Sequence, residues 1–108
     1  MQIDDIHKLV RAGRYEVSFH AQQERLEDDL DISEVETAIL SGKIIENYPD
    51  DPRGPSCLVS GQAGKKPVHV VVGWARTQDT NDRILRVITV YTPQAPKWSD
   101  PWTRGKKP

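Results

Sequence analysis

The 108-residue sequence contains one cysteine, few aromatic residues and no long apolar run. The lone Cys57 cannot form an internal disulfide, and with three scattered histidines it cannot complete a zinc site. No apolar stretch approaches the roughly 18 residues that a membrane-spanning helix requires, and no signal peptide opens the sequence. These absences argue against a disulfide scaffold, a zinc module and a membrane protein. They favour a cytoplasmic protein that acts without a metal or other cofactor.

The residues that are present fit one soluble globular domain. Hydrophobic residues make up 36% and charged residues 29%, which is close to the globular average. A chain of this length can bury a sufficient core without a metal or disulfide. We predict one domain over residues 1–96, followed by a tail over residues 97–108 that is rich in proline, tryptophan and lysine. The prolines after Thr92 predict that this end of the chain has no regular structure.

The net charge of −1 conceals an asymmetry between the two halves of the chain. Residues 1–54 hold thirteen acidic and six basic residues, whereas residues 55–108 hold nine basic and three acidic residues. A basic second half is typical of a surface that meets an anionic partner. Alternatively, the two halves face each other in the fold and neutralise one another.

Apolar residues recur at helical spacing in the first part of the chain and predict three helices. Gly13 stands where a left-handed C-cap follows the first helix, and Ser18 is a good N-cap for the second. Ser33 and Glu36 match a capping box at the start of the third helix, which Gly42 ends. The expected helices cover residues 4–12, 19–29 and 33–41.

The second helix takes its apolar positions from Phe19, Leu26 and Leu30. The residues before it, from Tyr15 to Ser18, form either a short strand or an extended connection. After Gly42 the apolar pattern alternates with a period of two, which predicts strands. The expected strands cover residues 43–48, 56–61, 67–75 and 84–91, with a polar turn over 77–83. Together these elements indicate an α+β fold with N-terminal helices packed on a four-stranded, mainly antiparallel sheet.

His20 is the first candidate for chemistry, because it falls in the opening turn of the second helix. Unpaired backbone N–H groups and the helix dipole favour a bound phosphate there, and a neutral imidazole beside it can serve as a general base. Glu24 lies four residues further on the same helical face and can orient or pair with His20. Arg25 lies on a different face of this helix. The alternative is that His20 only caps or packs.

A second group of candidates lies in the expected strands over 67–75 and 84–91. Alternation places His69 on the face opposite Val68 and Val70, and it places Thr89 and Tyr91 on the same face as Leu85 and Val87. A histidine, a threonine and a tyrosine near neighbouring strand ends suit a phosphodiester site. They suit ordinary sheet edges equally well.

Two tryptophans, Trp98 and Trp102, stand among basic residues in the tail. Aromatic and basic residues that alternate can stack on bases and hold phosphates. Alternatively, a tail tryptophan folds back over an exposed sheet face or lies at a partner interface.

A series of motifs runs in order over residues 18–98. The motifs are His20-Ala, Asp31-Ile-Ser-Glu-Val, Gly42-Lys-Ile-Ile-Glu-Asn-Tyr-Pro-Asp-Asp, Gly54-Pro-Ser-Cys-Leu-Val, Pro67-Val-His-Val-Val-Val and Ile88-Thr-Val-Tyr-Thr-Pro, with Trp98 after them. This series resembles a bacterial domain-of-unknown-function family of small stand-alone proteins, often encoded beside a small zinc-finger antitoxin-like protein. That family is similar to RelE/ParE-type toxins, so the resemblance implies a RelE-like fold.

The resemblance implies a toxin of a toxin–antitoxin pair that is a metal-independent endoribonuclease. Its partners would be RNA, with or without the ribosome, and a cognate antitoxin of zinc-finger type. In this reading His20 or His69 takes the 2′-hydroxyl proton, and Thr89 or Tyr91 holds the scissile phosphate. Charge on the phosphoryl oxygens is stabilised by Arg25 or Arg86. The RNA phosphates are bound by Lys65, Lys66, Arg83, Arg86 or the tail. The alternative is a protein-binding module, or a gyrase-type inhibitor, with the same fold and no enzymatic activity.

One departure from the family pattern concerns the second helix. Relatives place an arginine close behind the His-Ala pair and follow it with a basic turn. Here Arg25 is followed by the acidic residues Glu27, Asp28 and Asp29. The acidic turn argues against an RNA-facing role for this helix.

Overall fold

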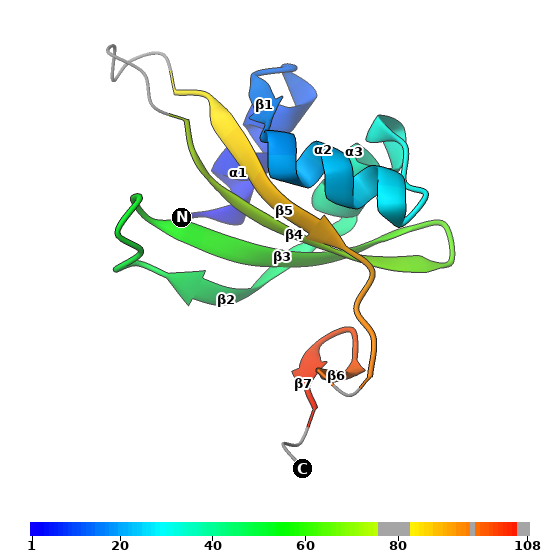
Figure 1. The fold of residues 1–108 in the computed structure, drawn as a ribbon. Helices are drawn as coiled ribbons and strands as arrows, with labels where there is room; N and C mark the ends of the chain where they lie inside the picture. The colour runs from blue at the N-terminus through cyan, green and yellow to red at the C-terminus, as the bar shows by residue number, and fades with distance from the viewer. Residues whose placement is uncertain (76–82, 96, 106–108) are drawn as a thin grey trace.

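The computed structural model describes residues 1–75, 83–95 and 97–105 as an α+β fold (Figure 1). The helices are α1 (Ile3–Arg11), α2 (Phe19–Glu27) and α3 (Ile32–Ser41). The strands are β1 (Tyr15–Val17), β2 (Lys43–Tyr48), β3 (Ser56–Ala63), β4 (Lys66–Trp74), β5 (Leu85–Tyr91), β6 (Trp98–Asp100) and β7 (Thr103–Arg104). The three predicted helices and four predicted strands are therefore present, with bounds shifted by two residues at most. Most of the expected turn over 77–83 lies outside the described residues.

The main sheet has five strands rather than the four that we expected, in the order β1-β5-β4-β3-β2. Strands β2 to β5 pair antiparallel with their neighbours, whereas β1 pairs parallel with β5, so the sheet is mixed. The three residues of β1 are too few to show an alternating pattern. The sequence therefore left this segment open between a strand and an extended connection.

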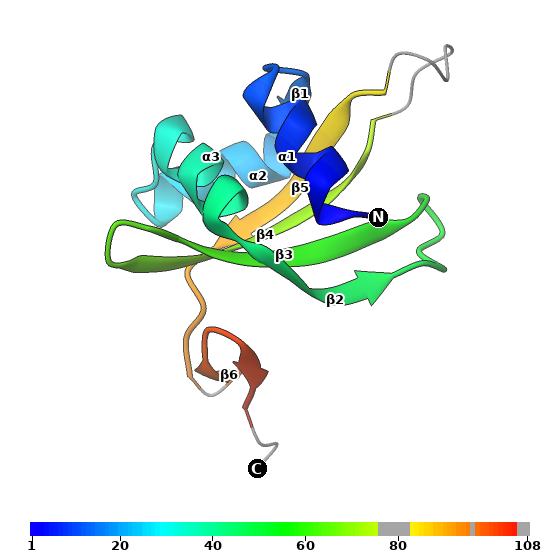
Figure 2. The same cartoon turned by 180° about the vertical axis from the view of Figure 1, so that it is seen from behind.

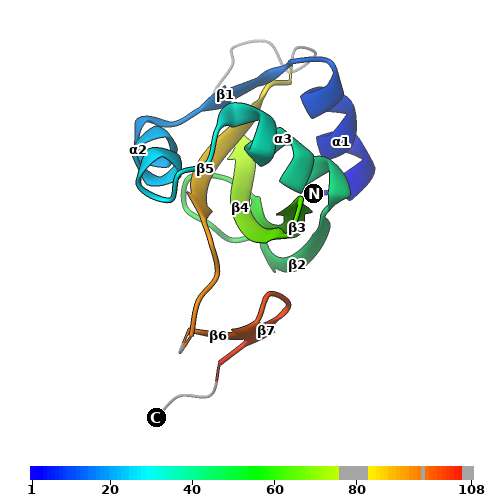
Figure 3. The ribbon, with the colours of Figure 1, turned by 90° about the vertical axis from the view of Figure 1, so that its right-hand side faces the viewer.

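Helices α1 and α3 cover one face of the sheet, as seen from behind in Figure 2 and from the side in Figure 3. The core between these layers includes Ile6 and Val10 of α1 and Ile39 of α3. Gly61 of β3 lies directly under α3, because a Cβ placed there would meet the carbonyl oxygen of Ala38 at 1.8 Å. Helix and strand can approach this closely only where the strand carries glycine.

Three of the predicted helix signals are confirmed and one is wrong. Gly42 is the C-cap that ends α3, as expected. Gly13 has φ +69° just after α1, and the Ser18 hydroxyl accepts a hydrogen bond from the N–H of Ala21 at 3.0 Å. The capping box of α3 is formed by Asp31 and Glu34, not by Ser33 and Glu36. Asp31 caps as well as serine does, and an N-cap two residues earlier lets the helix begin at Ile32.

Helix α2 does not bury the apolar positions that its sequence offers. Phe19 is 77% exposed and Leu26 is 66% exposed, while Leu30 is buried but lies beyond the helix end. This helix runs along β5 rather than over the sheet face (Figure 1). The carboxylate of Glu24 accepts from the N–H of Val90 at 3.1 Å, so α2 satisfies backbone groups on the free edge of β5 beyond β1.

A bulge in β5 changes which side chains share a face. Val72 pairs with Val87 and Val71 pairs with Thr89, so Ile88 is the extra residue. As a result Val87 and Val90 both lie in the core. We expected Val87 on the face of Thr89 and Tyr91, and that expectation is wrong because simple alternation does not continue through a bulge.

The C-terminal end has regular structure, contrary to our expectation from its prolines. Strands β6 and β7 form a two-stranded antiparallel hairpin on the side of the sheet away from α1 and α3 (Figures 2 and 3). Trp98 is only 3% exposed, and Pro101 lies in the turn of the hairpin. None of the described helices is long and apolar enough to span a membrane.

Candidate functional site

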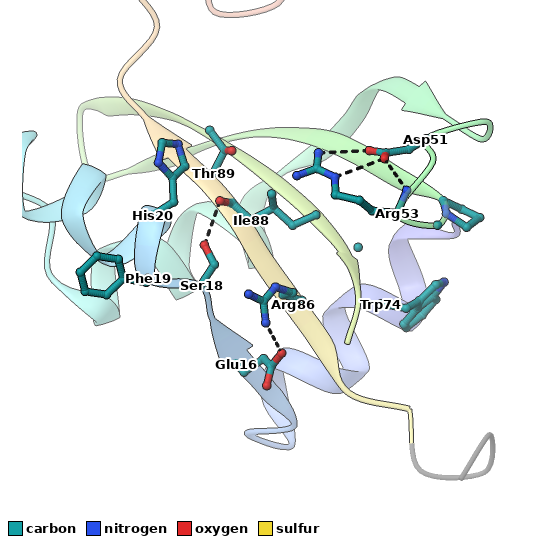
Figure 4. Close-up of a pocket in the computed structure, with 13 residues that line it drawn as sticks. Glu16, Ser18, Phe19, His20, Asp51, Arg53, Trp74, Arg86, Ile88 and Thr89 are labelled. Atoms are coloured by element: carbon teal, nitrogen blue, oxygen red, sulfur yellow. Dashed lines mark hydrogen bonds and ion pairs between the residues drawn. The ribbon is translucent and has the colours of Figure 1, made fainter. Parts of the chain in front are cut away.

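A groove of about 820 Å³ lies where the β1–α2 junction meets the bulge of β5 (Figure 4). The loop between β2 and β3 and the end of β4 supply its other side. The residues that line it include Glu16, Ser18, Phe19, His20, Asp51, Arg53, Trp74, Arg86, Ile88 and Thr89.

Ser18 fixes the position of helix α2 at the groove. Its N–H donates to the carbonyl of Val87 at 2.9 Å, and its hydroxyl donates to the carbonyl of Ile88 at 3.0 Å. The same hydroxyl oxygen caps α2 by accepting from Ala21. Together these bonds tie the first turn of α2 to the bulge, so His20 and Thr89 border the same groove (Figure 4).

His20 has a carboxylate partner on its own helix. The Nε2 atom of His20 lies 3.2 Å from Oε1 of Glu24, and the imidazole itself is exposed. When Nε2 donates its hydrogen to this carboxylate, Nδ1 is left as an acceptor. A histidine held by a carboxylate in this way can remove a proton from a substrate hydroxyl.

Two arginines in the groove are each paired with a carboxylate. Arg86 lies 2.6 Å from Glu16, and Arg53 lies 3.4 Å from Asp51. The backbone N–H and guanidinium of Arg53 lower the pKa of Asp51 below its usual value. The Arg86–Glu16 pair is exposed at both residues, and such pairs contribute little to stability, so a phosphate can replace Glu16 as the partner of Arg86. The guanidinium of Arg53 is itself exposed and can also bind a phosphate.

The groove also has aromatic surface. Phe19 is largely exposed at the start of α2, and Trp74 lines the opposite side near the end of β4. The guanidinium of Arg83 lies 4.7 Å from the centre of the Trp74 ring. An aromatic ring with an arginine beside it is a common platform for stacking a base.

His69 and Tyr91 lie together, but away from this groove. Nδ1 of His69 accepts from the hydroxyl of Tyr91 at 3.0 Å, and Nε2 donates to the carbonyl of Pro101 at 2.6 Å. Trp98 packs edge-on against the imidazole, with ring centres 4.4 Å apart. Burial lowers the pKa of His69 and raises the pKa of Tyr91. The C-terminal hairpin therefore covers two of the five predicted catalytic residues.

Three further predicted residues lie in two other places. Arg25 donates to the carbonyl of Leu30 at 3.1 Å and so supports the turn after α2. Lys65 and Lys66 lie at the β3–β4 turn, where Lys66 is 3.1 Å from Glu34. Of the nine predicted site residues, the structure thus brings His20, Thr89 and Arg86 to the groove, with Arg83 beside Trp74.

Sequence reasoning missed Glu16, Phe19, Asp51, Arg53 and Trp74 as groove residues. Asp51 and Arg53 occur in a loop that was predicted from its prolines and glycine. An acidic and a basic residue two positions apart in such a loop were the available signal that it carries site residues. Phe19 was assigned to the apolar side of its helix. In the described part of the chain, no group of three or more His, Cys, Asp or Glu side chains could hold a metal ion.

Comparison with known proteins gave one match. The model of a family described as "Domain of unknown function (DUF4258)" matches residues 17–92, which include every strand of the main sheet apart from the start of β1. No curated protein and no solved structure matched the chain.

Proposed function

This chain belongs to the DUF4258 family, and we propose that it is the toxin of a bacterial toxin–antitoxin pair that cleaves RNA in the cytoplasm. The proposal includes a RelE/ParE-type fold, which two helices on one face of a largely antiparallel sheet support. The observation that carries it is the convergence on one groove of Thr89, Arg86 and a histidine, His20, that is paired with Glu24.

The proposed reaction is metal-independent attack of a ribose 2′-hydroxyl on the adjacent phosphate. His20 takes the hydroxyl proton, the 2′-oxygen forms a bond to phosphorus, and the bond from phosphorus to the 5′-oxygen breaks. The 5′-oxygen leaves with a proton from water, and the other product ends in a 2′,3′-cyclic phosphate. Glu24 holds the imidazole in position, and the proton transfer to His20 is general base catalysis, which contributes about 10²–10⁴ in rate.

Arginine and aromatic side chains would hold the substrate. Arg53 and Arg86 take up phosphate oxygens in exchange for their present carboxylates. The Thr89 hydroxyl donates to the scissile phosphate, while Phe19 and Trp74 offer stacking surfaces for unpaired bases. Single-stranded RNA is therefore the favoured substrate class.

The experiment compares His20→Ala with Gln23→Ala, a change at an exposed neighbour on α2 that does not line the groove. We expect His20→Ala to lose cleavage of a labelled single-stranded RNA by at least a hundredfold, and Gln23→Ala to match the parent. Cleavage should persist in a metal chelator, and a 2′-deoxy substitution at the cleaved position should abolish it. Equal cleavage by His20→Ala and parent, or cleavage of the 2′-deoxy strand, contradicts the mechanism.

The exposed side chains of Phe19 and Leu26 favour a second function, a protein-binding module without enzymatic activity. They stand seven residues apart, which places them on one face of α2, where a cognate antitoxin of zinc-finger type or a target such as gyrase could bind. Growth arrest on induced expression, with total RNA intact, would favour this module. Degraded RNA under the same conditions would favour the nuclease.

A further inference from the structure

The C-terminal hairpin, residues 97–105 and called here the tail hairpin, is attached to the sheet through side chains. Its strands pair only with each other, so it does not extend the main sheet. Residues 92–95, which join it to β5, form no helix or strand. Figure 1 shows the tail hairpin as a separate unit beside the sheet. Side-chain contacts, rather than strand pairing, therefore hold the tail hairpin on the main sheet, as they hold a peptide in a binding site.

The first two anchors are an aromatic ring and a carbonyl. Trp98 is 3% exposed and lies edge-on against the His69 ring. The carbonyl oxygen of Pro101 accepts from Nε2 of His69 at 2.6 Å and from the hydroxyl of Ser60 at 2.9 Å. Tyr91 donates to the other nitrogen of His69, which fixes the tautomer that gives Nε2 its hydrogen. Both donors belong to the main sheet and are in place for any carbonyl presented there.

The third anchor is a guanidinium held by a carboxylate. Arg104 donates to both oxygens of Glu46 of β2, at 2.8 and 2.9 Å, and Glu46 also accepts from the hydroxyl of Tyr48. These bonds, that of Arg104 first, lower the pKa of Glu46 to about 2. The guanidinium also lies 4.6 Å from the centre of the Trp98 ring. Two-oxygen recognition of this kind selects arginine over lysine.

We propose that this face, formed by Glu46, Ser60, His69 and Tyr91, is a peptide-binding site for a Trp-x-x-Pro-x-x-Arg segment. The chain's own tail hairpin fills the site, and the same segment can bind there from another chain. None of the four residues lines the groove, so the inference goes beyond the proposed ribonuclease and stands independently of it.

The test uses the full-length chain with Trp98→Ser, which removes the buried anchor of the tail hairpin and leaves the site intact. The probe is a fluorescent peptide with the sequence of residues 97–105. Fluorescence anisotropy should show the peptide binding at least tenfold more tightly to this variant than to the parent, whose site is occupied. Circular dichroism confirms that the variant is folded. If Trp98→Ser does not fold, Arg104→Glu replaces it, because that guanidinium is half-exposed.

Peptide variants supply the matched controls. A Trp98→Ser peptide should lose binding at least tenfold, whereas a Trp102→Ser peptide should bind like the parent peptide, since Trp102 is 47% exposed. A peptide with Arg104→Glu should bind poorly to the Trp98→Ser chain. Its affinity should recover when that chain also carries Glu46→Arg, because the two charges of the pair are then exchanged. If the folded variant, whose tail hairpin has been detached by Trp98→Ser or Arg104→Glu, does not bind the parent peptide, the proposal is overturned. Equal binding of the Trp98→Ser and parent peptides would overturn it too.

Discussion

Glu24 uses one carboxylate oxygen for two purposes. Oε1 accepts from the N–H of Val90 at 3.1 Å and lies 3.2 Å from Nε2 of His20. The pairing with His20 was predictable, because residues four apart in a helix are neighbours. The bond to Val90 was not predictable, because it depends on β1 ending and leaving the edge of β5 free. A candidate catalytic partner thus also holds the helix in place.

The ion pair of Glu46 with Arg104 predicts how the stability of the fold depends on pH. Chiefly through the hydrogen bond from Arg104, the pKa of Glu46 falls from 4.5 to about 2 on folding. The folded chain keeps this carboxylate ionised where the unfolded chain protonates it, so its contribution to stability is complete above about pH 4.5 and is lost as the pH falls toward 2. We expect the free energy of unfolding, measured in urea from about pH 6 to about pH 2.5, to fall more steeply for the parent than for Glu46→Gln. The exposed Glu27→Gln serves as control, and identical slopes for the parent and Glu46→Gln contradict the prediction.

Among the elements, predictability followed length and regularity. Strand β4 was correctly predicted to place Val68 and Val70 together on one face, and the structure shows that this face meets the core. Strand β1 has three residues and pairs with β5 far along the chain, so its sequence carries no signal of its own. The bulge at Ile88 and the burial of Trp98 depend on contacts made only in the folded chain. Thr89 and Tyr91 stand two residues apart in regular register, but Tyr91 contacts the His69 ring on which Trp98 packs, whereas Thr89 lines the groove.

The close contact between α3 and β3 predicts that any side chain at position 61 destabilises the fold. Gly61→Ala would place a Cβ 1.8 Å from the carbonyl oxygen of Ala38, which is backbone and cannot rotate away. We expect the free energy of unfolding in urea to drop by about 3 kcal/mol, since α3 must move off the sheet. Gln62→Ala, at the exposed neighbouring position, should change stability by less than about 0.5 kcal/mol. A Gly61→Ala chain as stable as the parent means that α3 does not lie this close to β3.

Across the whole molecule, part of the charge asymmetry of the sequence is used in ion pairs between the two halves of the chain. Ion pairs join the acidic half to the basic half between Glu34 and Lys66, between Glu16 and Arg86, and between Glu46 and Arg104. These pairs support the alternative in which the two halves neutralise each other. The groove arginines are therefore only partly available to an anionic ligand.

Because Glu16 neutralises Arg86, we expect removal of the Glu16 charge to raise the affinity for RNA. Glu16→Gln removes the carboxylate that competes for Arg86, so labelled single-stranded RNA should bind about fivefold more tightly, since an exposed ion pair is worth up to about 1 kcal/mol. The salt dependence of binding should steepen by about one phosphate contact. Glu27→Gln makes the same change of net charge on α2, outside the groove, and controls for it. If Glu16→Gln and Glu27→Gln increase RNA affinity equally, the change in net charge alone accounts for the effect and the prediction is contradicted.

The place of β5 in the sheet has a consequence for how the chain is made. It is the last of the five strands to be synthesised, yet it lies between β1 and β4 and holds them together. Its contacts with β1 span 70 positions in the sequence, as between Glu16 and Arg86. While the ribosome still holds β5, β1 has no strand partner and β4 has only one. The sheet can therefore close only after β5 has left the ribosome, and the contacts that form the groove appear after that.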